Sequence, residues 1–270
     1  MKSGNFFFEF EDLSWFPHTI RESMTDYLRY LLTTLDLYKP VIPLIADGLN
    51  KSKTNKILDL CSGGGGPIEQ LLPPLQNHLG LNIEITLTDK YPNISAYEML
   101  ALKLNGSVSF SHESVDAAHV PSSLSGFRTL FSGFHHFNKK YAQSIIQNAV
   151  NAKSGIGIFD GGDKNIFTVL GIILLHPIAF FLFTPFFKPF RFSRIFFTYL
   201  IPIIPLCTIW DGVVSIIRLH NPGQLIEMAE EVDRVNYSWK AGTVKNKFGM
   251  RIAYLIGTPL ADTSIENGKV

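Results

Sequence analysis

Residues 56–67 read KILDLCSGGGGP, a short apolar run followed by four glycines and a proline. The run 56–60 is typical of a buried strand, and Pro67 is favoured in the first turn of a helix. Glycines between a strand and a helix let a ligand approach the backbone at the N-terminus of the helix. This stretch therefore predicts a strand, a tight loop that binds a small ligand, and a helix.

Short apolar runs and helical periods alternate on both sides of this loop. Further strands are expected at 83–89, 108–111, 128–132, 155–159, 237–241 and 251–257, and helices at 17–37, 39–49, 94–104, 139–150 and 222–232. This order predicts an α/β fold with helices on both faces of a doubly wound sheet. Asn93 is the expected N-cap of helix 94–104. The helix at 17–37 is expected to be amphipathic, because Arg21, Asp26 and Arg29 lie off its apolar positions.

The composition excludes several classes of protein. The chain has 270 residues, of which 46% are hydrophobic and 17% charged, and this length holds one domain with a full core. Its 24 Lys+Arg and 23 Asp+Glu give a net charge of +1, which offers no basic face, so no nucleic-acid partner is expected. Two cysteines and a start without a secretory signal predict a cytosolic context.

Two acidic residues follow the next two strands at positions suited to a nucleoside. Asp89 lies 24 residues after Gly65, where a carboxylate can accept hydrogen bonds from both hydroxyls of a ribose. Asp116 is placed to bond an adenine amino group, or alternatively to cap a helix or turn. The chain has no GxxxxGK[ST] motif, which excludes a P-loop, and the GxGxxG pattern read from Gly63 has Ile68 at its third glycine, which weakens NAD binding.

The pattern acid-x-small-x-Gly-x-Gly, which starts at Asp59, resembles the first motif of class I S-adenosylmethionine-dependent methyltransferases, with Cys61 at the first glycine position. The order of motifs is similar to that family over residues 55–160, and the strand pair at 237–257 fits it. The resemblance implies a Rossmann-like, seven-stranded sheet whose last strand is antiparallel, preceded by N-terminal lid helices. It also implies S-adenosyl-L-methionine as the cofactor and methyl transfer as the reaction.

The same resemblance assigns the residues that bind the cofactor. They are Asp59, Cys61, Gly63 and Gly65 at the amino-acid part, Asp89 at the ribose, Asp116 and Ala117 at the adenine, and Ser132 after the fourth strand. A flexible linker is the alternative role for the glycine run. Its position between a strand and a helix, with an acid at the expected distance, favours binding.

The stretch FSGFHHF at 131–137 resembles the fourth motif of the family, which lies beside the transferred methyl. His135 or His136 is the candidate general base, because a neutral imidazole can take a proton from a hydroxyl or ammonium near pH 7. Adjacent side chains on an extended segment point to opposite sides, so one of the two is expected to be structural. The other histidines are scattered and no Cys/His ligand spacing occurs, so no metal site is expected.

Residues 164–210 differ from the rest of the chain in composition. Ten of the 22 phenylalanines fall in 167–197, and the uncharged stretches 166–187 and 195–210 flank a basic patch at 188–194. The first stretch is long enough to cross a bilayer. The strands on either side belong to one sheet, so the chain must return to the side that it left. We expect a hairpin or shallow re-entrant segment in the membrane interface, with its basic residues at lipid headgroups; two transmembrane helices are the alternative.

These features divide the chain into parts. The expected parts are lid helices at 1–52, a methyltransferase domain at 53–163 and 211–259, the apolar membrane-associating insertion at 164–210, and a flexible tail at 260–270. The insertion follows the fifth strand, at the edge where α/β sheets bind ligands, so it can cover the pocket and admit a lipophilic acceptor from the membrane.

The expected acceptor-binding residues are Asp211, Arg218, Trp15 and Glu11. Their simpler roles are a salt bridge or cap for the first two, and docking on the core for the N-terminal pair. The chain is thus expected to be a methyltransferase on the cytoplasmic face of a membrane, acting on oxygen or nitrogen of a lipophilic small molecule. A non-catalytic membrane-docking module with a vestigial nucleoside pocket and an NAD(P)-dependent oxidoreductase are the alternatives.

Overall fold

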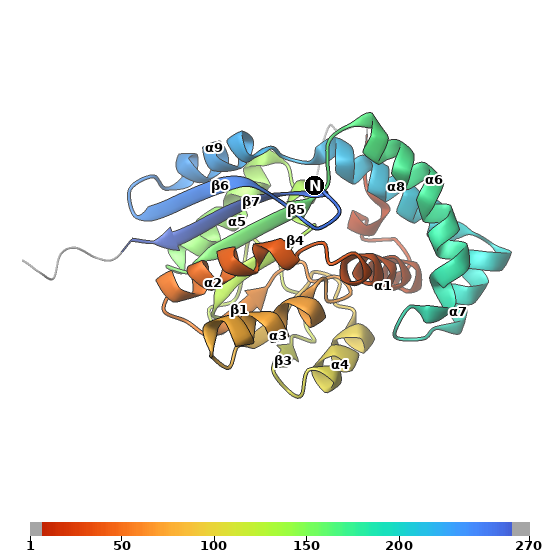
Figure 1. The fold of residues 1–270 in the computed structure, drawn as a ribbon, viewed down its shortest axis with the longest axis horizontal. Helices are drawn as coiled ribbons and strands as arrows, with labels where there is room; N and C mark the ends of the chain where they lie inside the picture. The colour runs from red at the N-terminus through yellow and green to blue at the C-terminus, as the bar shows by residue number, and fades with distance from the viewer. Residues whose placement is uncertain (1–6, 261–270) are drawn as a thin grey trace, which may run out of the picture.

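The computed structural model describes residues 7–260, so the beginning of the expected lid segment and nearly all of the expected flexible tail lie outside the described residues. One seven-stranded sheet runs through the molecule in the order β3-β2-β1-β4-β5-β7-β6 (Figure 1). Its strands are β1 (Lys56–Asp59), β2 (Glu84–Leu87), β3 (Val108–Phe110), β4 (Phe127–Phe131), β5 (Ile156–Gly161), β6 (Tyr237–Lys245) and β7 (Arg251–Pro259). The first five are parallel, and β7 is antiparallel to both of its neighbours. The predicted Rossmann-like sheet with an antiparallel last strand is confirmed.

Helices cover both faces of this sheet, because alternate residues of the central strands point to opposite sides and are apolar on both. One face carries α2 (Ile42–Lys51), α3 (Ile68–Leu79) and α4 (Ile94–Lys103), and the other carries α5 (Lys139–Asn151) and α9 (Pro222–Val232). The side chain of Asn93 accepts a hydrogen bond from the N–H of Ala96, which confirms it as the N-cap of α4.

Helix α1 (His18–Thr34) lies beside the carboxyl ends of the parallel strands, next to α8 (Ile203–Arg218) (Figure 1). Its charged residues Arg21, Asp26 and Arg29 are 6%, 0% and 5% exposed. The helix is amphipathic as predicted, but its charged face is buried because other segments of the chain pack against it. Of the two helices expected in the lid, α1 lies at this edge, whereas α2 belongs to the core on one face of the sheet.

The apolar stretch forms a helical hairpin beside α1 (Figure 1). It consists of α6 (Ile166–Phe183), the turn η4 (Thr184–Phe186), α7 (Phe192–Ile195), the π-helical turn η5 (Phe196–Leu200) and α8. In the part of the chain that the structure describes, Ile166–Phe186 is the one helix long and apolar enough to cross a membrane. The bent pair Phe192–Leu200 and Ile203–Arg218, inclined at 81°, is a second candidate if it counts as one broken span. Helix α8 continues past residue 210, where the insertion was expected to end.

The basic residues at the tip of the hairpin turn toward the protein. Arg194 is 1% exposed and forms an ion pair with Asp26 of α1. Arg191 lies 2.6 Å from Glu22 Oε2 and 3.3 Å from Asp26 Oδ2. The expectation that the basic residues meet lipid headgroups is therefore wrong for these two arginines, because carboxylates of α1 are their partners.

Candidate active site

A cavity opens at the carboxyl ends of β1, β2 and β4, between the sheet and α1. Three of its walls are the loops that follow these strands, and α1 with the residues before it forms the fourth. The lining includes residues 61–64, 66, 89–91, 131–133, 136 and 137 from the sheet side, and 11, 12, 21, 25, 28, 29 and 32 from the N-terminal side.

The glycine loop after β1 packs against its neighbours in a way that only glycine permits. Gly65 has φ +97°, and a Cβ there would lie 2.1 Å from Cδ1 of Leu100. A Cβ at Gly64 would lie 2.6 Å from the carbonyl oxygen of Thr25, so α1 rests directly on the loop. Cys61 has φ +56°, which explains why the related motif uses glycine at this position. A side chain in this left-handed conformation costs about 1 kcal/mol.

Asp59 does not line the cavity, and its side chain contacts the glycine loop on the side away from the cavity. Its carboxylate accepts hydrogen bonds from Ser62 Oγ at 2.7 Å and from Thr129 Oγ1 at 2.5 Å. Burial raises the pKa of Asp59 to about 7, although both hydrogen bonds lower it. Its observed contacts therefore fix the shape of the loop.

Asp89 lines the cavity directly after β2. Its Oδ2 accepts a hydrogen bond from the N–H of Gly63 at 2.8 Å, and its Oδ1 accepts one from the N–H of Tyr91 at 2.7 Å. Burial raises the pKa of Asp89, although these hydrogen bonds and the charge of Arg21 lower it. The guanidinium of Arg21 lies 4.0 Å from the centre of the Tyr91 ring. A carboxylate, a guanidinium and an aromatic ring thus meet in one part of the cavity.

The two residues expected at the adenine lie outside the cavity lining. The carboxylate of Asp116 accepts hydrogen bonds from the hydroxyl of Tyr141 at 2.5 Å and from the N–H of Ala118 at 2.9 Å. Ala117 is buried in the core beneath α5. The contacts of Asp116 correspond to its alternative role, the stabilisation of a turn.

His136 lines the cavity and is surrounded by carboxylates of the N-terminal segment. Its Nδ1 lies 3.2 Å from Glu9 Oε2 and 3.1 Å from Asp12 Oδ1, and its Nε2 lies 3.6 Å from Glu11 Oε1. Burial lowers the pKa of His136, but the charges of Glu9 and Asp12 outweigh this effect and raise it well above its ordinary value. Burial raises the pKa of Glu11 to about 8.

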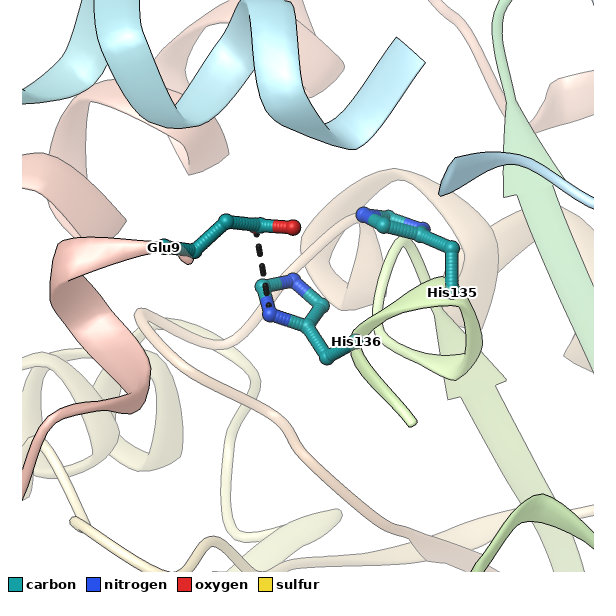
Figure 2. A group of neighbouring side chains, drawn as sticks. All are labelled: Glu9, His135 and His136. Carbon is teal, nitrogen blue, oxygen red and sulfur yellow. Dashed lines mark ion pairs between the residues drawn. The ribbon is translucent and has the colours of Figure 1, made fainter. Parts of the chain in front are cut away.

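His135 and His136 belong to one turn of 3-10 helix, η3 (Phe134–His136), which follows β4. Their ring centres are 4.6 Å apart, so the two side chains lie next to each other (Figure 2). The expectation that they point in opposite directions is therefore wrong, because the segment is not extended. His135 does not line the cavity, and its Nδ1 lies 3.1 Å from Oδ1 of Asp160, at the end of β5.

Asp211 and Arg218 attach the N-terminal segment to α8. The carboxylate of Asp211 accepts hydrogen bonds from the N–H groups of Phe10 at 2.7 Å and Glu11 at 3.1 Å. Nη1 of Arg218 lies 3.0 Å from Oε1 of Glu9. Both residues lie outside the cavity lining, and these contacts match their simpler role as a cap and a salt bridge. Glu11 lines the cavity, whereas Trp15 is 70% exposed and does not.

Several residues of the site have no signal in the sequence motifs. Those that line the cavity or contact His136 are Glu9, Asp12, Arg21, Thr25 and Arg29. All of them precede the sheet in the chain. Arg21, Thr25 and Arg29 reach the site through the packing of α1, and Glu9 and Asp12 reach it because the N-terminal segment is attached to α8. The sequence feature that could have indicated Arg21 and Arg29 is the group of charged residues within helix 17–37, because the chain has few charged residues.

Solved structures with the same architecture identify the fold. Human N-acetylserotonin methyltransferase, solved with S-adenosylmethionine, matches with a TM-score of 0.53 and 9% identity over 90% of this chain and 56% of that one. An O-methyltransferase from neocarzinostatin biosynthesis, solved with S-adenosyl-L-homocysteine and 1,4-dihydroxy-2-naphthoic acid, matches with a TM-score of 0.52 and 12% identity over 90% of this chain and 59% of that one. The chain has the class I methyltransferase fold.

The similarity to solved enzymes is seen in structure and not in the comparisons of sequence. No protein-family model matches the chain, and no curated protein is significantly similar to it in sequence. The chain spans less than two thirds of the length of either solved enzyme.

Proposed function

We propose that the chain is an S-adenosylmethionine-dependent methyltransferase that methylates oxygen or nitrogen of a lipophilic small molecule. The observation that carries this proposal is one cavity, at the carboxyl edge of a methyltransferase-type sheet, lined by the glycine loop, Asp89 and His136. The two solved enzymes compared above hold S-adenosylmethionine or S-adenosyl-L-homocysteine. Glycine backbone at a helix N-terminus and an acid after the next strand are the features by which such folds bind nucleosides.

The cofactor would occupy the part of the cavity between the glycine loop and α1. We assign its amino-acid part to the backbone from Cys61 to Gly64 and its ribose to Asp89, with the Arg21–Tyr91 pair beside it. Asp59 would act indirectly, through the shape of the loop. Ser132, which lines the same cavity after β4, would face the sulfonium end.

The acceptor must lose a proton when its oxygen or nitrogen attacks the sulfonium methyl. His136, Glu11 and Asp12 are titratable side chains around η3 in the cavity wall, and we assign removal of the proton to the neutral form of His136, which its raised pKa makes the minor form near pH 7. We propose His136 as the catalytic residue in contact with the acceptor, supported by His135 beside it. Most of the remaining rate enhancement would come from alignment of the acceptor with the methyl and from exclusion of water by α1.

We propose that residues 166–210 attach the enzyme to the cytoplasmic face of a membrane. Of the 29 large hydrophobic side chains exposed in the described part of the chain, 20 lie in this segment, and apolar surfaces of this extent mark membrane or protein contacts. Arg194 is buried against Asp26 of α1, which supports a hairpin whose tip would stay on the side of the catalytic domain. The hairpin would then lie in one leaflet, and a lipophilic acceptor would enter the cavity from it.

Calorimetric titration of S-adenosyl-L-homocysteine into the purified chain tests the cofactor, with NADH and ATP as controls. We expect selective binding of S-adenosyl-L-homocysteine and weaker binding to the Asp89→Asn variant. The variant His136→Ala should retain this affinity while losing methyl transfer. Binding of NADH instead would favour the oxidoreductase, and full methyl transfer by both His135→Ala and His136→Ala would contradict the catalytic assignment.

Flotation with vesicles of phosphatidylcholine and phosphatidylglycerol tests the membrane proposal. Leu174 in α6 is 62% exposed, so Leu174→Asp should reduce the fraction of protein that floats with the vesicles. Leu102 in α4 is 82% exposed but lies outside the hairpin, so Leu102→Asp is the matched control. Equal flotation of the two variants would exclude α6 as the membrane contact.

A further inference from the structure

Three potential metal ligands meet between the N-terminal segment and the turn after β4. One atom each from Glu9, His135 and His136 lies within 4.8 Å of the others (Figure 2). The sequence predicts no metal site, because Glu9 is far from the histidines in the chain and no ligand spacing connects them. We propose that these three residues bind one divalent transition-metal ion.

The state of His135 is the first argument for this site. It is 5% exposed, and neither of its ring nitrogens makes a hydrogen bond of regular geometry within residues 7–260. Nδ1 faces Asp160 at 3.1 Å, and the ring nitrogen farther from the backbone points toward the carboxylate of Glu9 (Figure 2). A buried polar atom without a partner is unfavourable, and a metal ion bound to Nε2 would satisfy it.

The carboxylates behind the histidines are the second argument. The other ring nitrogen of each histidine faces an acid: Nδ1 of His135 lies 3.1 Å from Oδ1 of Asp160, and Nδ1 of His136 lies 3.1 Å from Oδ1 of Asp12. A histidine that binds a metal generally donates its other N–H to a carboxylate or carbonyl, which fixes the tautomer and the orientation of the ring. The same arrangement on both adjacent histidines favours metal binding over a purely structural pair.

The position and charge of Glu9 fit the same site. Glu9 is 0% exposed, and its carboxylate accepts hydrogen bonds from Ser215 Oγ and from Arg218 Nη1, each at 3.0 Å. Two imidazoles and a carboxylate suit zinc, iron or cobalt better than magnesium or calcium, which prefer ligand sets of oxygen alone.

The chemical role of the ion rests on the proposed methyltransferase function. Because His136 lines the cavity, the ion would be reached from the side where the acceptor binds. Bound to an acceptor hydroxyl, a divalent ion lowers the pKa of that hydroxyl. The hydroxyl proton would pass to solvent, the oxygen electron pair would form the bond to the methyl carbon, and the pair of the broken carbon–sulfur bond would remain on sulfur.

Metal titration of the chelator-treated full chain tests this inference. Calorimetry with Zn²⁺, and visible absorption with Co²⁺, should show one ion per chain. His135→Ala and Glu9→Gln should each lower the affinity for Zn²⁺ by about 100-fold or more, and Asp160→Asn by about 10-fold or more. His119→Ala is the matched control, because the side chain of His119 is 77% exposed and lies outside the group.

Absence of a bound ion in the folded wild-type chain overturns the inference, as does unchanged Zn²⁺ affinity in folded Asp160→Asn and Glu9→Gln variants. Circular dichroism of each sample establishes that it is folded. Titration of S-adenosyl-L-homocysteine into the same samples separates the two proposals. Cofactor binding without metal binding removes the metal site alone, whereas metal binding without cofactor binding removes the methyltransferase and supports the site.

Discussion

Replacement of Arg194 by methionine tests how the hairpin is attached to α1. Arg194 is 1% exposed, and it pairs with the carboxylate of Asp26, which is 0% exposed. Removal of one member of a buried ion pair leaves an uncompensated charge and costs about 3–5 kcal/mol. Nε of Arg191 lies 3.3 Å from the same carboxylate and keeps part of the compensation. We therefore expect Arg194→Met to lower the free energy of unfolding by about 3 kcal/mol, at the lower end of that range.

Urea unfolding followed by tryptophan fluorescence measures this loss. The double variant Asp26→Asn/Arg194→Met should be more stable than the sum of the two single losses implies, by about 1–3 kcal/mol, because it leaves neither charge unpaired. Arg234→Met is the control, since Arg234 is 74% exposed and its pair with Glu230 should contribute less than about 1 kcal/mol. A loss below about 1 kcal/mol for Arg194→Met, or additive losses in the double variant, would refute the argument that this pair fastens the hairpin.

Two further predictions concern the glycine loop. Gly65→Ala should weaken S-adenosyl-L-homocysteine binding by about 10-fold or more in calorimetry, because residue 65 has φ +97° and the added Cβ would lie 2.1 Å from Leu100. Gly66→Ala is the control, since residue 66 has φ +48° and no atom lies within 4 Å of the added Cβ. Equal losses of affinity in the two variants would contradict the role of the close contact. The pKa of Asp59 rises from 3.8 to about 7 on folding, so between these pH values the carboxyl is protonated in the folded chain and ionised in the unfolded chain. The free energy needed to keep this carboxyl in the folded interior therefore grows as pH rises from 4 to 7. Wild-type stability in urea should therefore fall relative to Asp59→Asn over this pH range, by up to about 4 kcal/mol, and a constant difference would contradict the raised pKa.

The strands, most helices and the glycine loop were predictable because each is encoded by neighbouring residues. The apolar run before Cys61 defines β1, and Asn93 caps α4 through the N–H of a residue three positions later. Parallel strands bring their carboxyl ends to one edge, so the order of elements also placed Asp89 at the cavity.

The remaining part of the site depends on contacts between distant segments. Arg191 and Arg194 follow an apolar stretch, which is typical of headgroup binding, but their partners are acids of α1 that no local pattern connects to them. Likewise, Glu9 reaches His136 only because Asp211 and Arg218 hold the N-terminal segment on α8.

The position of α1 gives this helix two contacts of opposite kind. On one side the carbonyl of Thr25 rests on Gly64 without space for a single methyl group, and on the other Tyr27 stacks on Phe180 of α6 with ring centres 3.9 Å apart. Within 17 residues, the helix thus touches both the glycine loop and the most apolar surface of the molecule. A displacement of the hairpin that moved α1 would therefore also change the space around the glycines.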